Sequence, residues 1–407
     1  MSYFKNSELA DTYHVSDRTV RYWIQLAKEG KLDLALHTEG DKSYLAKTSG
    51  NILIIEKHVA KFKKHRPRNA HKIVTPRPEF YRLFTQSQIY DIVRNLEMHH
   101  EIPRQYNYFD GGATEWDQYT QELAKEKTPS LLTKTAELLA ESQNYLDKRL
   151  AKYDRVNVVD IGVGNALPSK GLLAHLIQEK RLGRYIAIDI SPEMLDIAER
   201  NVKQWFGDKI VIEKYEMDIT HERFTNILAE GYLSSTNDTA NLVLFFGGTA
   251  DNFRNPDDAF RTINESMNTN DLLIYSDKLE TEEMSPQWFQ YSAKPGKLEL
   301  APIHRVVFDL LNIDDSFYDV EMGFNERTRQ RYTKTRLKVA LTLKFLFDEG
   351  ERVVEFEKGD AILLWRSWQM TAPLVYEQFN RNGFYTLHSS QTDDREYLLT
   401  VSQVKRN

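Results

Sequence analysis

An acidic residue and two glycines at the end of one apolar run have the types and spacing of a nucleoside-binding loop. The run Val156–Ile161 contains Asp160 and leads directly into Gly162-Val163-Gly164. Glycine lets a backbone approach its ligand closely, but this D-x-G-x-G pattern lacks the third glycine that dinucleotide sites use for a pyrophosphate. The chain also has no G-x-x-x-x-G-K-[ST] sequence, which argues against a P-loop ATPase.

Two further acidic residues follow the next two predicted strands. Asp189 stands at the end of Tyr185–Ile188, and Asp218 follows Ile210–Glu213. A carboxylate at the first position can accept hydrogen bonds from both hydroxyls of a ribose, and one at the second can accept from the exocyclic amine of adenine. With the glycine loop, these residues favour S-adenosylmethionine (SAM) over NAD as the cofactor.

Strands and helices alternate through residues 156–275, which predicts a doubly wound parallel sheet. Its fourth strand, Leu242–Phe246, opens into the loop Gly247-Gly248-Thr249-Ala250-Asp251-Asn252-Phe253. Ligands bind such sheets at the carboxyl ends of the strands, where the strand order reverses. We therefore predict six residues that bind the cofactor: Asp160, Gly162, Gly164, Asp189, Asp218 and Gly247.

Several segments around these residues form a recognisable set: VVDIGVGNALPSKGLL, RYIAIDISPEMLDIA, LVLFFGGTADNF and YNYFDGGATE. This set resembles the SAM-dependent histidine-specific Nα-methyltransferases of ergothioneine biosynthesis and their fungal tryptophan-methylating relatives, over residues 105–407. The resemblance implies an α/β fold: a Rossmann-like SAM methyltransferase sheet with a second α+β substrate domain. It also implies that the enzyme is a methyltransferase.

The resemblance implies a substrate site beside the SAM contacts. Asn252 matches an asparagine that holds the amino and carboxylate groups of the substrate amino acid, and Tyr291 falls near a tyrosine with the same task. Ser367 matches a serine beside the substrate side chain. We therefore predict Asn252 and Tyr291 as the catalytic residues.

Three positions depart from the pattern of the histidine enzymes. Trp365 stands where they have a glutamate that recognises imidazole, Thr128 where they have a substrate-binding tyrosine, and Pro168 where a lysine is expected. The substrate is therefore predicted to be an amino acid or a related small amine other than histidine, with Thr128, Asn252, Tyr291, Trp365 and Ser367 around it.

Methyl transfer to nitrogen is an in-line displacement that needs a neutral amine with a free lone pair. An ammonium must first lose a proton to a side chain or to water. The sequence leaves three candidate proton acceptors: Asp110, Asp251 and Tyr291.

The N-terminal segment KNSELADTYHVSDRTVRYWIQLAKEGKL predicts helices over residues 8–13 and 17–28, and a β-wing follows with strands over 32–36 and 43–46. It resembles the MerR/excisionase-type winged helix-turn-helix, which implies a second helix in the DNA major groove. Residues 1–78 carry a net charge of +7 and the remainder −13. The predicted DNA contacts are Arg18, Arg21, Tyr22 and Lys42; a protein-docking or vestigial module is the alternative.

The predicted organisation has six parts, in chain order. They are a winged helix-turn-helix (1–66), a basic linker (67–80), a helical part of the substrate domain (81–127), the Rossmann SAM-binding core (128–276), a substrate-domain insertion (277–365) and a final helix and strands of the Rossmann sheet (366–407).

Composition excludes several functions. The chain has no cysteine, so it has neither thiolate metal ligands nor the nucleophile of a C5-cytosine methyltransferase, and it lacks the [DNS]-P-P-[YFW] sequence of adenine-N6 enzymes. Its 11 histidines are scattered, and we predict no metal site. Without a signal peptide or an apolar run of about 18 residues, the protein is predicted to be cytoplasmic, with no membrane partner. A transcription regulator that senses SAM or a metabolite without turnover is the alternative function.

Overall fold

The computed structural model describes residues 3–13, 15, 17–40, 42–65, 71–126, 128–233, 239–280 and 298–405. The chain forms two compact units, Met1–Ala70 and His71–Asn407.

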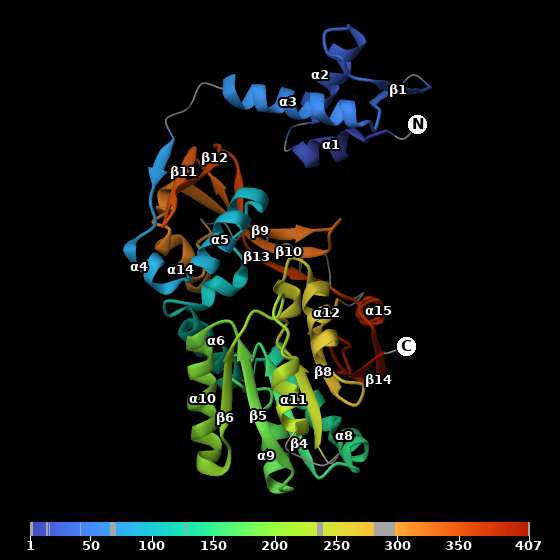
Figure 1. Ribbon diagram of the computed structural model, residues 1–407, viewed down its shortest axis with the longest axis vertical. Helices are drawn as coiled ribbons and strands as arrows, with labels where there is room; N and C mark the ends of the chain where they lie inside the picture. The colour runs from blue at the N-terminus through green and yellow to red at the C-terminus, as the bar shows by residue number, and fades with distance from the viewer. Residues whose placement is uncertain are drawn as a thin grey trace. The chain divides into compact units, whose positions relative to one another are not determined.

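The first unit contains two helices, a two-stranded hairpin and a third helix (Figure 1): α1 (Asn6–Tyr13), α2 (Asp17–Lys28), β1 (Leu36–Glu39), β2 (Lys42–Leu45) and α3 (Ser49–His65). Their apolar faces meet in one core around the buried Trp23. The α2 helix has the predicted bounds, whereas the first hairpin strand begins later than predicted. The reason is that the chain turns tightly after α2, where the backbone N–H groups of Lys31 and Leu32 both donate to the carbonyl of Leu26.

The second unit contains a mixed sheet whose order is β14-β15-β8-β7-β4-β5-β6 in the described part of the chain. Neighbours from β8 to β6 pair in parallel, while β15 is antiparallel to both β8 and β14. The bounds are β4 (Arg155–Ile161), β5 (Leu182–Asp189), β6 (Ile212–Glu216), β7 (Thr239–Phe245), β8 (Leu272–Lys278), β14 (Phe384–Gln391) and β15 (Tyr397–Val404). The predicted doubly wound parallel sheet is confirmed for β4, β5, β6, β7 and β8, to which β15 and β14 add an antiparallel edge.

Helices cover both faces of this sheet (Figure 1). Residues alternate along β4, so that Val156 and Val158 pack on one face and Val159 and Ile161 on the other. The first face is covered by α7 (Leu131–Glu141), α8 (Gln143–Leu150), α9 (Lys170–Gln178) and α10 (Pro192–Phe206). The second is covered by α11 (Thr225–Leu233), α12 (Pro256–Ser266) and α15 (Ala372–Arg381).

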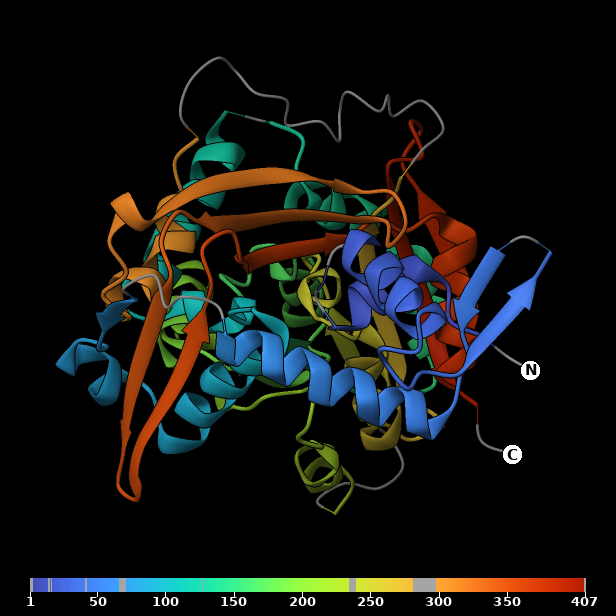
Figure 2. The ribbon, with the colours of Figure 1, turned by 90° about the horizontal axis from the view of Figure 1, so that it is seen from above.

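The remainder of the second unit packs around a separate apolar core that includes Phe80, Phe308 and Phe345. Two three-stranded sheets, β13-β10-β9 and β12-β11-β3, form its frame (Figure 2). The strands are β3 (Lys72–Val74), β9 (Tyr318–Asn325), β10 (Gln330–Leu337), β11 (Leu341–Phe347), β12 (Gly350–Phe356) and β13 (Ala361–Trp368). The helical elements are α4 (Pro78–Leu83), α5 (Gln86–His99), η1 (Arg104–Tyr108), α6 (Gly112–Lys125) and α14 (Pro302–Leu310).

Two predicted boundaries are wrong. The linker expected over residues 67–80 contains β3, which pairs in parallel with β11, and the start of α4. The insertion expected to end at residue 365 continues through β13 to Trp368, because β13 pairs with β10 up to that residue. Ser367 therefore belongs to the small sheet and not to the final segment. None of the described helices is long and apolar enough to cross a membrane.

Candidate active site

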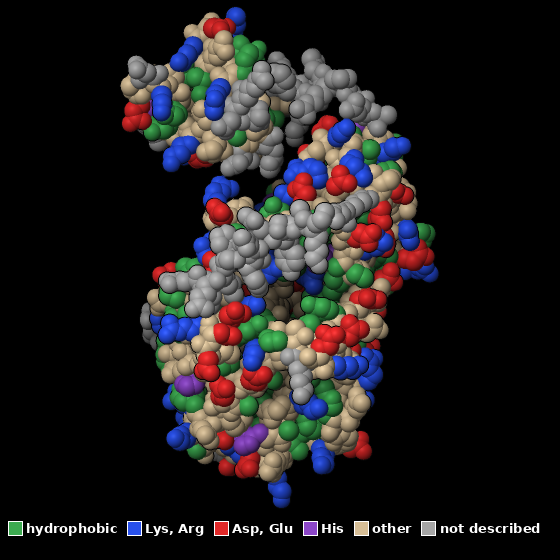
Figure 3. Space-filling model, turned by 180° about the vertical axis from the view of Figure 1, so that it is seen from behind, with side chains coloured by type: hydrophobic (Ala, Val, Ile, Leu, Met, Phe, Trp, Pro, Cys, Tyr) green, Lys and Arg blue, Asp and Glu red, His purple; other side chains and the backbone are tan. Residues whose placement is uncertain are grey.

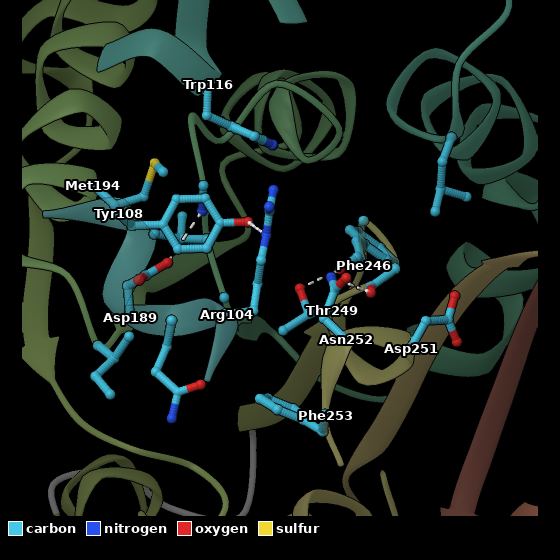
Figure 4. Close-up of a pocket in the computed structure, with 18 of the residues that line it drawn as sticks. Arg104, Tyr108, Trp116, Asp189, Met194, Phe246, Thr249, Asp251, Asn252 and Phe253 are labelled. Atoms are coloured by element: carbon cyan, nitrogen blue, oxygen red, sulfur yellow. Dashed lines mark hydrogen bonds between the residues drawn. The ribbon is translucent and has the colours of Figure 1, made fainter. Parts of the chain in front are cut away.

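A cavity of about 350 Å³ lies at the carboxyl ends of β4, β5 and β7. β4 and β7 are neighbours in the sheet, and the chain moves outward from them in opposite directions, which makes this edge the switch point where such sheets bind ligands. Loops of the large sheet form one part of the wall, and η1, α6, α7, α10, β10 and β13 contribute other parts. In Figure 4, Asp189 and Met194 lie on one side, Thr249 and Asn252 on the other, and Arg104 reaches between them.

The loop after β4 needs both of its predicted glycines. Gly162 and Gly164 have φ values of 62° and 56°, a left-handed conformation that favours glycine. A Cβ on Gly164 would lie 2.9 Å from the Trp116 ring, and a Cβ on Gly162 would lie 3.0 Å from Thr249 Oγ1. The loop is therefore a close-fitting cradle that leaves backbone exposed to a ligand.

Asp189 ends β5 with its carboxylate in the cavity wall. Its Oδ1 accepts the backbone N–H of Ser191 at 3.0 Å, and its Oδ2 lies 3.5 Å from the backbone nitrogen of Gly164. Burial raises the pKa of Asp189 to about 6, so the carboxyl group is mostly ionised at neutral pH. The side chain is only half-buried, which leaves lone pairs available to ribose hydroxyls.

The other two predicted acids also line the cavity. Asp160 is almost fully buried; its Oδ2 accepts the Tyr185 hydroxyl at 3.0 Å, and burial raises its pKa to about 7. Asp218 is half-buried, and its Oδ1 accepts the backbone N–H of Thr220 at 2.9 Å. The Thr220 hydroxyl donates to the same Oδ1, so Oδ2 of Asp218 takes no hydrogen bond from Thr220.

Asn252 is held in place by two hydrogen bonds. Its Nδ2 donates to the carbonyl of Gly248 at 2.9 Å, and its Oδ1 accepts the indole N–H of Trp365 at 2.7 Å. The loop can make the first bond because Gly247 and Gly248 have φ values of 77° and 69°. A ligand that uses Asn252 Oδ1 must therefore replace or share the indole of Trp365.

The sequence did not indicate two cavity residues, Arg104 and Arg331, or His304, which contacts Arg104. Arg104 Nη1 lies 2.9 Å from His304 Nδ1, and the guanidinium carbon of Arg331 lies 5.7 Å from the centroid of the Trp365 ring. Burial, with the nearby charge of Arg104, lowers the pKa of His304 to about 3, so a neutral imidazole accepts this hydrogen bond. Arg104 and His304 are 200 positions apart, and no local motif signals their contact.

A pair of buried carboxyl groups stands behind the cavity wall. Asp251 lines the cavity, and its side chain meets that of Asp277, whose Oδ2 accepts the Tyr275 hydroxyl at 2.9 Å. Burial and the charge of Asp277 raise the pKa of Asp251 well above its usual range, while burial raises the pKa of Asp277 to about 6. The pair therefore holds one shared proton near neutral pH.

The remaining predicted residues have different outcomes. Gly247 and Ser367 line the cavity, and Ser367 Oγ accepts from Gln369 Nε2 at 3.0 Å. Thr128 does not: it is exposed beyond the end of α6, and Leu131 and Leu132 occupy the wall after it, so its role as a substrate residue stays a prediction. Tyr291 lies outside the described residues.

Of the four predicted DNA contacts, Arg21, Tyr22 and Lys42 are exposed on α2 and β2 of the first unit. Arg18 is the second residue of α2, and its side chain lies outside what the structure describes. In the parts of the chain that the structure describes, no cluster of three His, Asp or Glu side chains could hold a metal ion.

The strand order and the loop contacts define the class of Rossmann-like, SAM-binding methyltransferases. Residues 88–404 match the family model described as histidine-specific methyltransferase, SAM-dependent, so the chain belongs to this family. It is a SAM-dependent methyltransferase that acts on small molecules, and its cofactor is SAM. The residues present fit this cofactor for two reasons. The loop after β4 has room for a ligand only because Gly162 and Gly164 lack a Cβ, and the Asp189 carboxylate can accept hydrogen bonds from a ribose.

Solved structures similar to this chain are also methyltransferases. One is a SAM-dependent methyltransferase from Clostridium acetobutylicum ATCC 824 (10% identity, TM-score 0.39, covering 72% of this chain and 99% of that one). Another is CalS10, an amino pentose methyltransferase from Micromonospora echinaspora (10% identity, TM-score 0.34, covering 70% of this chain and 97% of that one). A third is the 1,6-didemethyltoxoflavin-N1-methyltransferase of Burkholderia thailandensis (11% identity, TM-score 0.34, covering 75% of this chain and 91% of that one). No curated protein matches the chain.

Proposed function

We propose that this enzyme methylates the nitrogen of an amino acid or a related small amine other than histidine. The observation that carries the proposal is the composition of one cavity. Asn252 lines the same cavity as the glycine loop and Asp189, whereas Trp365 occupies the position of the glutamate expected to recognise imidazole. An indole N–H donates only, so it cannot accept the imidazole N–H as a carboxylate can.

SAM would be held by the loop Gly162–Gly164 and by Asp189 and Asp218, and it would supply a methyl group on a sulfonium. Asn252 would orient the acceptor amine through its Oδ1, in place of the indole N–H of Trp365. Of the candidate proton acceptors, Asp251 lines the cavity, whereas Asp110 is exposed. Burial and the charge of Asp277 keep the proton of the pair on Asp251, so Asp251 would take a proton from the ammonium as it passes its own proton to the ionised Asp277.

The test is methyl transfer from labelled SAM over a panel of amino acids and small amines, with the products identified by mass spectrometry. We expect N-methylated product from at least one member other than histidine, and loss of that product in Asn252→Ala. Methylation of histidine alone, or transfer to oxygen or carbon only, would contradict the proposal.

A sensor without turnover is the second candidate. The Trp365–Asn252 hydrogen bond favours it, since the amide oxygen expected to hold a substrate already has a donor. Binding of S-adenosylhomocysteine without transfer to any member of the panel would select this candidate.

For the first unit we propose a winged helix-turn-helix that binds DNA. Two helices followed by a hairpin, with exposed Arg21, Tyr22 and Lys42, support this, as does the net charge of +7 over residues 1–78. A salt-dependent DNA mobility shift that is lost in the double variant Arg18→Ala/Arg21→Ala is the expected result. An unchanged shift in that variant would contradict it. Cytoplasmic location stays a prediction from the sequence.

A further inference from the structure

Arg104 differs from Lys278, another basic residue of the cavity, in the charge of its partners. Lys278 lies 3.4 Å from the Glu396 carboxylate, and Arg331 lies over the Trp365 ring. Arg104 donates to the Tyr108 hydroxyl at 3.3 Å and to the neutral His304. Among the described residues, no carboxylate forms an ion pair with Arg104, although its side chain is half-buried. Its positive charge is therefore uncompensated inside the cavity.

A groove of about 870 Å³ continues from the cavity and carries more positive charge. It shares Arg104, Asn252 and Phe253 with the cavity wall and adds Arg94 and Arg254. No ion pair is formed by Arg94 or Arg254 within the described ranges. Partial burial, together with the charges of Arg366 and Arg94, lowers the pKa of Arg254, which places these like charges near one another.

The acidic residues of the groove are already engaged. Glu101 forms a buried ion pair with Arg366, and Asp257 accepts from Arg381 at 2.8 Å. Asp258 pairs with Arg261 at 3.3 Å, Asp91 accepts the Tyr106 hydroxyl at 2.9 Å, and Asp251 shares a proton with Asp277. Among the described residues of the groove, Arg94, Arg104 and Arg254 lack an acidic partner, and their three positive charges exceed the charge left on Asp91 and on the Asp251–Asp277 pair.

This accumulation is local. Acidic and basic side chains are interspersed over the face of the second unit drawn in Figure 3, without a large area of one sign. A broad positive surface would suit a long polyanion such as nucleic acid. Separate arginines at the entrance of a small cavity instead suit a small anionic group, which a planar guanidinium binds through two parallel hydrogen bonds.

We propose that the methyl acceptor carries a carboxylate or phosphate group, additional to any α-carboxylate, that binds between Arg104 and Arg254. The inference rests on the proposed function, because it concerns the acceptor of the same cavity. Arg254 follows Asn252 by two residues on one loop, so an anion bound there lies close to the residue that orients the amine. Nearby positive charge also disfavours an ammonium ion and favours the neutral amine that methyl transfer needs.

The test compares acceptors matched in size but not in charge. Glutamate against glutamine probes a carboxylate, and O-phosphoserine against serine probes a phosphate. Each is titrated by calorimetry into the full-length protein saturated with S-adenosylhomocysteine. We expect at least one acid to bind about tenfold more tightly than its neutral partner, the gain from one charge-assisted pair of hydrogen bonds.

Three variants make the result specific. Arg104→Gln and Arg254→Gln should each reduce the preference for the acid to about twofold or less. Arg223→Gln removes an exposed arginine whose partner is Glu265, and neither residue lines the cavity or the groove, so this variant should keep the full preference. Thermal unfolding of each variant checks that it is folded.

Equal binding of the acids and their neutral partners, no binding of any acid, or a preference that survives Arg254→Gln would overturn this inference. Such results leave the proposed methyltransferase function intact if S-adenosylhomocysteine still binds and a neutral amine is methylated. Failure to bind S-adenosylhomocysteine would instead count against the proposed function itself.

Discussion

The two sides of the cavity are built differently. The donor side consists of Gly162, Gly164, Asp189 and Asp218, which follow three consecutive strands of one sheet. The acceptor side consists of Arg104, Asn252, Arg331, Trp365 and Ser367, which come from η1, the loop after β7, β10 and β13. A side assembled from neighbouring strand ends is fixed by local sequence, whereas one assembled from distant elements can change its chemistry without disturbing the sheet.

The largest effect is expected from a substitution that disrupts the donor side alone. Asp189→Ala removes a carboxylate that can accept two ribose hydroxyls, and each hydrogen bond to a charged group contributes about 1.5–3 kcal/mol. We expect S-adenosylhomocysteine to bind about 100-fold more weakly by calorimetry. The matched control is Asp196→Ala, an exposed acid of α10 whose side chain is 71% accessible, which should keep wild-type affinity. Wild-type affinity in Asp189→Ala would place the nucleoside elsewhere.

Low pH should weaken the binding of S-adenosylhomocysteine through the same carboxylate. Burial raises the pKa of Asp189 to about 6, and protonation replaces one acceptor with a hydroxyl group. The affinity for S-adenosylhomocysteine should therefore stay constant above about pH 7 and fall about tenfold by pH 5, the loss expected for one proton. In Asp189→Asn this pH dependence should disappear, and an unaltered pH profile in that variant would assign the titration to another group.

The donor side could be predicted from the sequence, and so could the strands that carry it. Asp160, Gly162, Gly164, Asp189, Asp218 and Gly247 all line the cavity, because apolar runs followed by glycine or acid mark the carboxyl ends of parallel strands. The predicted third strand lay two residues early at its start, and β6 in fact runs from Ile212 to Glu216. Strand boundaries depend on pairing with β5, which the local pattern does not contain.

Most of the acceptor side could not be predicted in this way. Trp365 was identified by its position in the motif, but its bond to Asn252 depends on β13 reaching the loop after β7. The contact between Arg104 and His304 depends on η1 packing against α14, and β3 was mistaken for part of a linker because its pairing partner β11 lies far along the chain. Such contacts follow from tertiary packing, and no periodic pattern in the sequence predicts them.

A smaller effect is expected from the bond that joins the two walls of the acceptor side. Trp365→Phe keeps the aromatic surface and removes the donor to Asn252 Oδ1. If this indole competes with the substrate amine, its loss should tighten binding of an amino-acid acceptor about fivefold, the net value of one hydrogen bond of about 1 kcal/mol. Binding of S-adenosylhomocysteine should be unchanged.

The control for this variant is Trp368→Phe, which removes an indole bond from the same strand to the carbonyl of Phe253. It should not tighten acceptor binding. Weaker acceptor binding in Trp365→Phe would mean that the indole holds Asn252 in its working rotamer and does not compete with the substrate.

The smallest effect is expected at Thr128, which the sequence assigned to the substrate and the structure removes from the cavity. Thr128→Ala should change acceptor affinity and the free energy of unfolding by less than about 0.5 kcal/mol, as is usual for exposed positions. A larger loss of acceptor affinity would restore Thr128 to the acceptor side.

The most direct measurement is a crystal structure of the protein with S-adenosylhomocysteine. The nucleoside should lie against the loop Gly162–Gly164, with both ribose hydroxyls within about 3 Å of the Asp189 carboxylate and the sulfur facing Asn252. A ligand bound outside this cavity, or a ribose that makes no contact with Asp189, would contradict the assignment of the donor side.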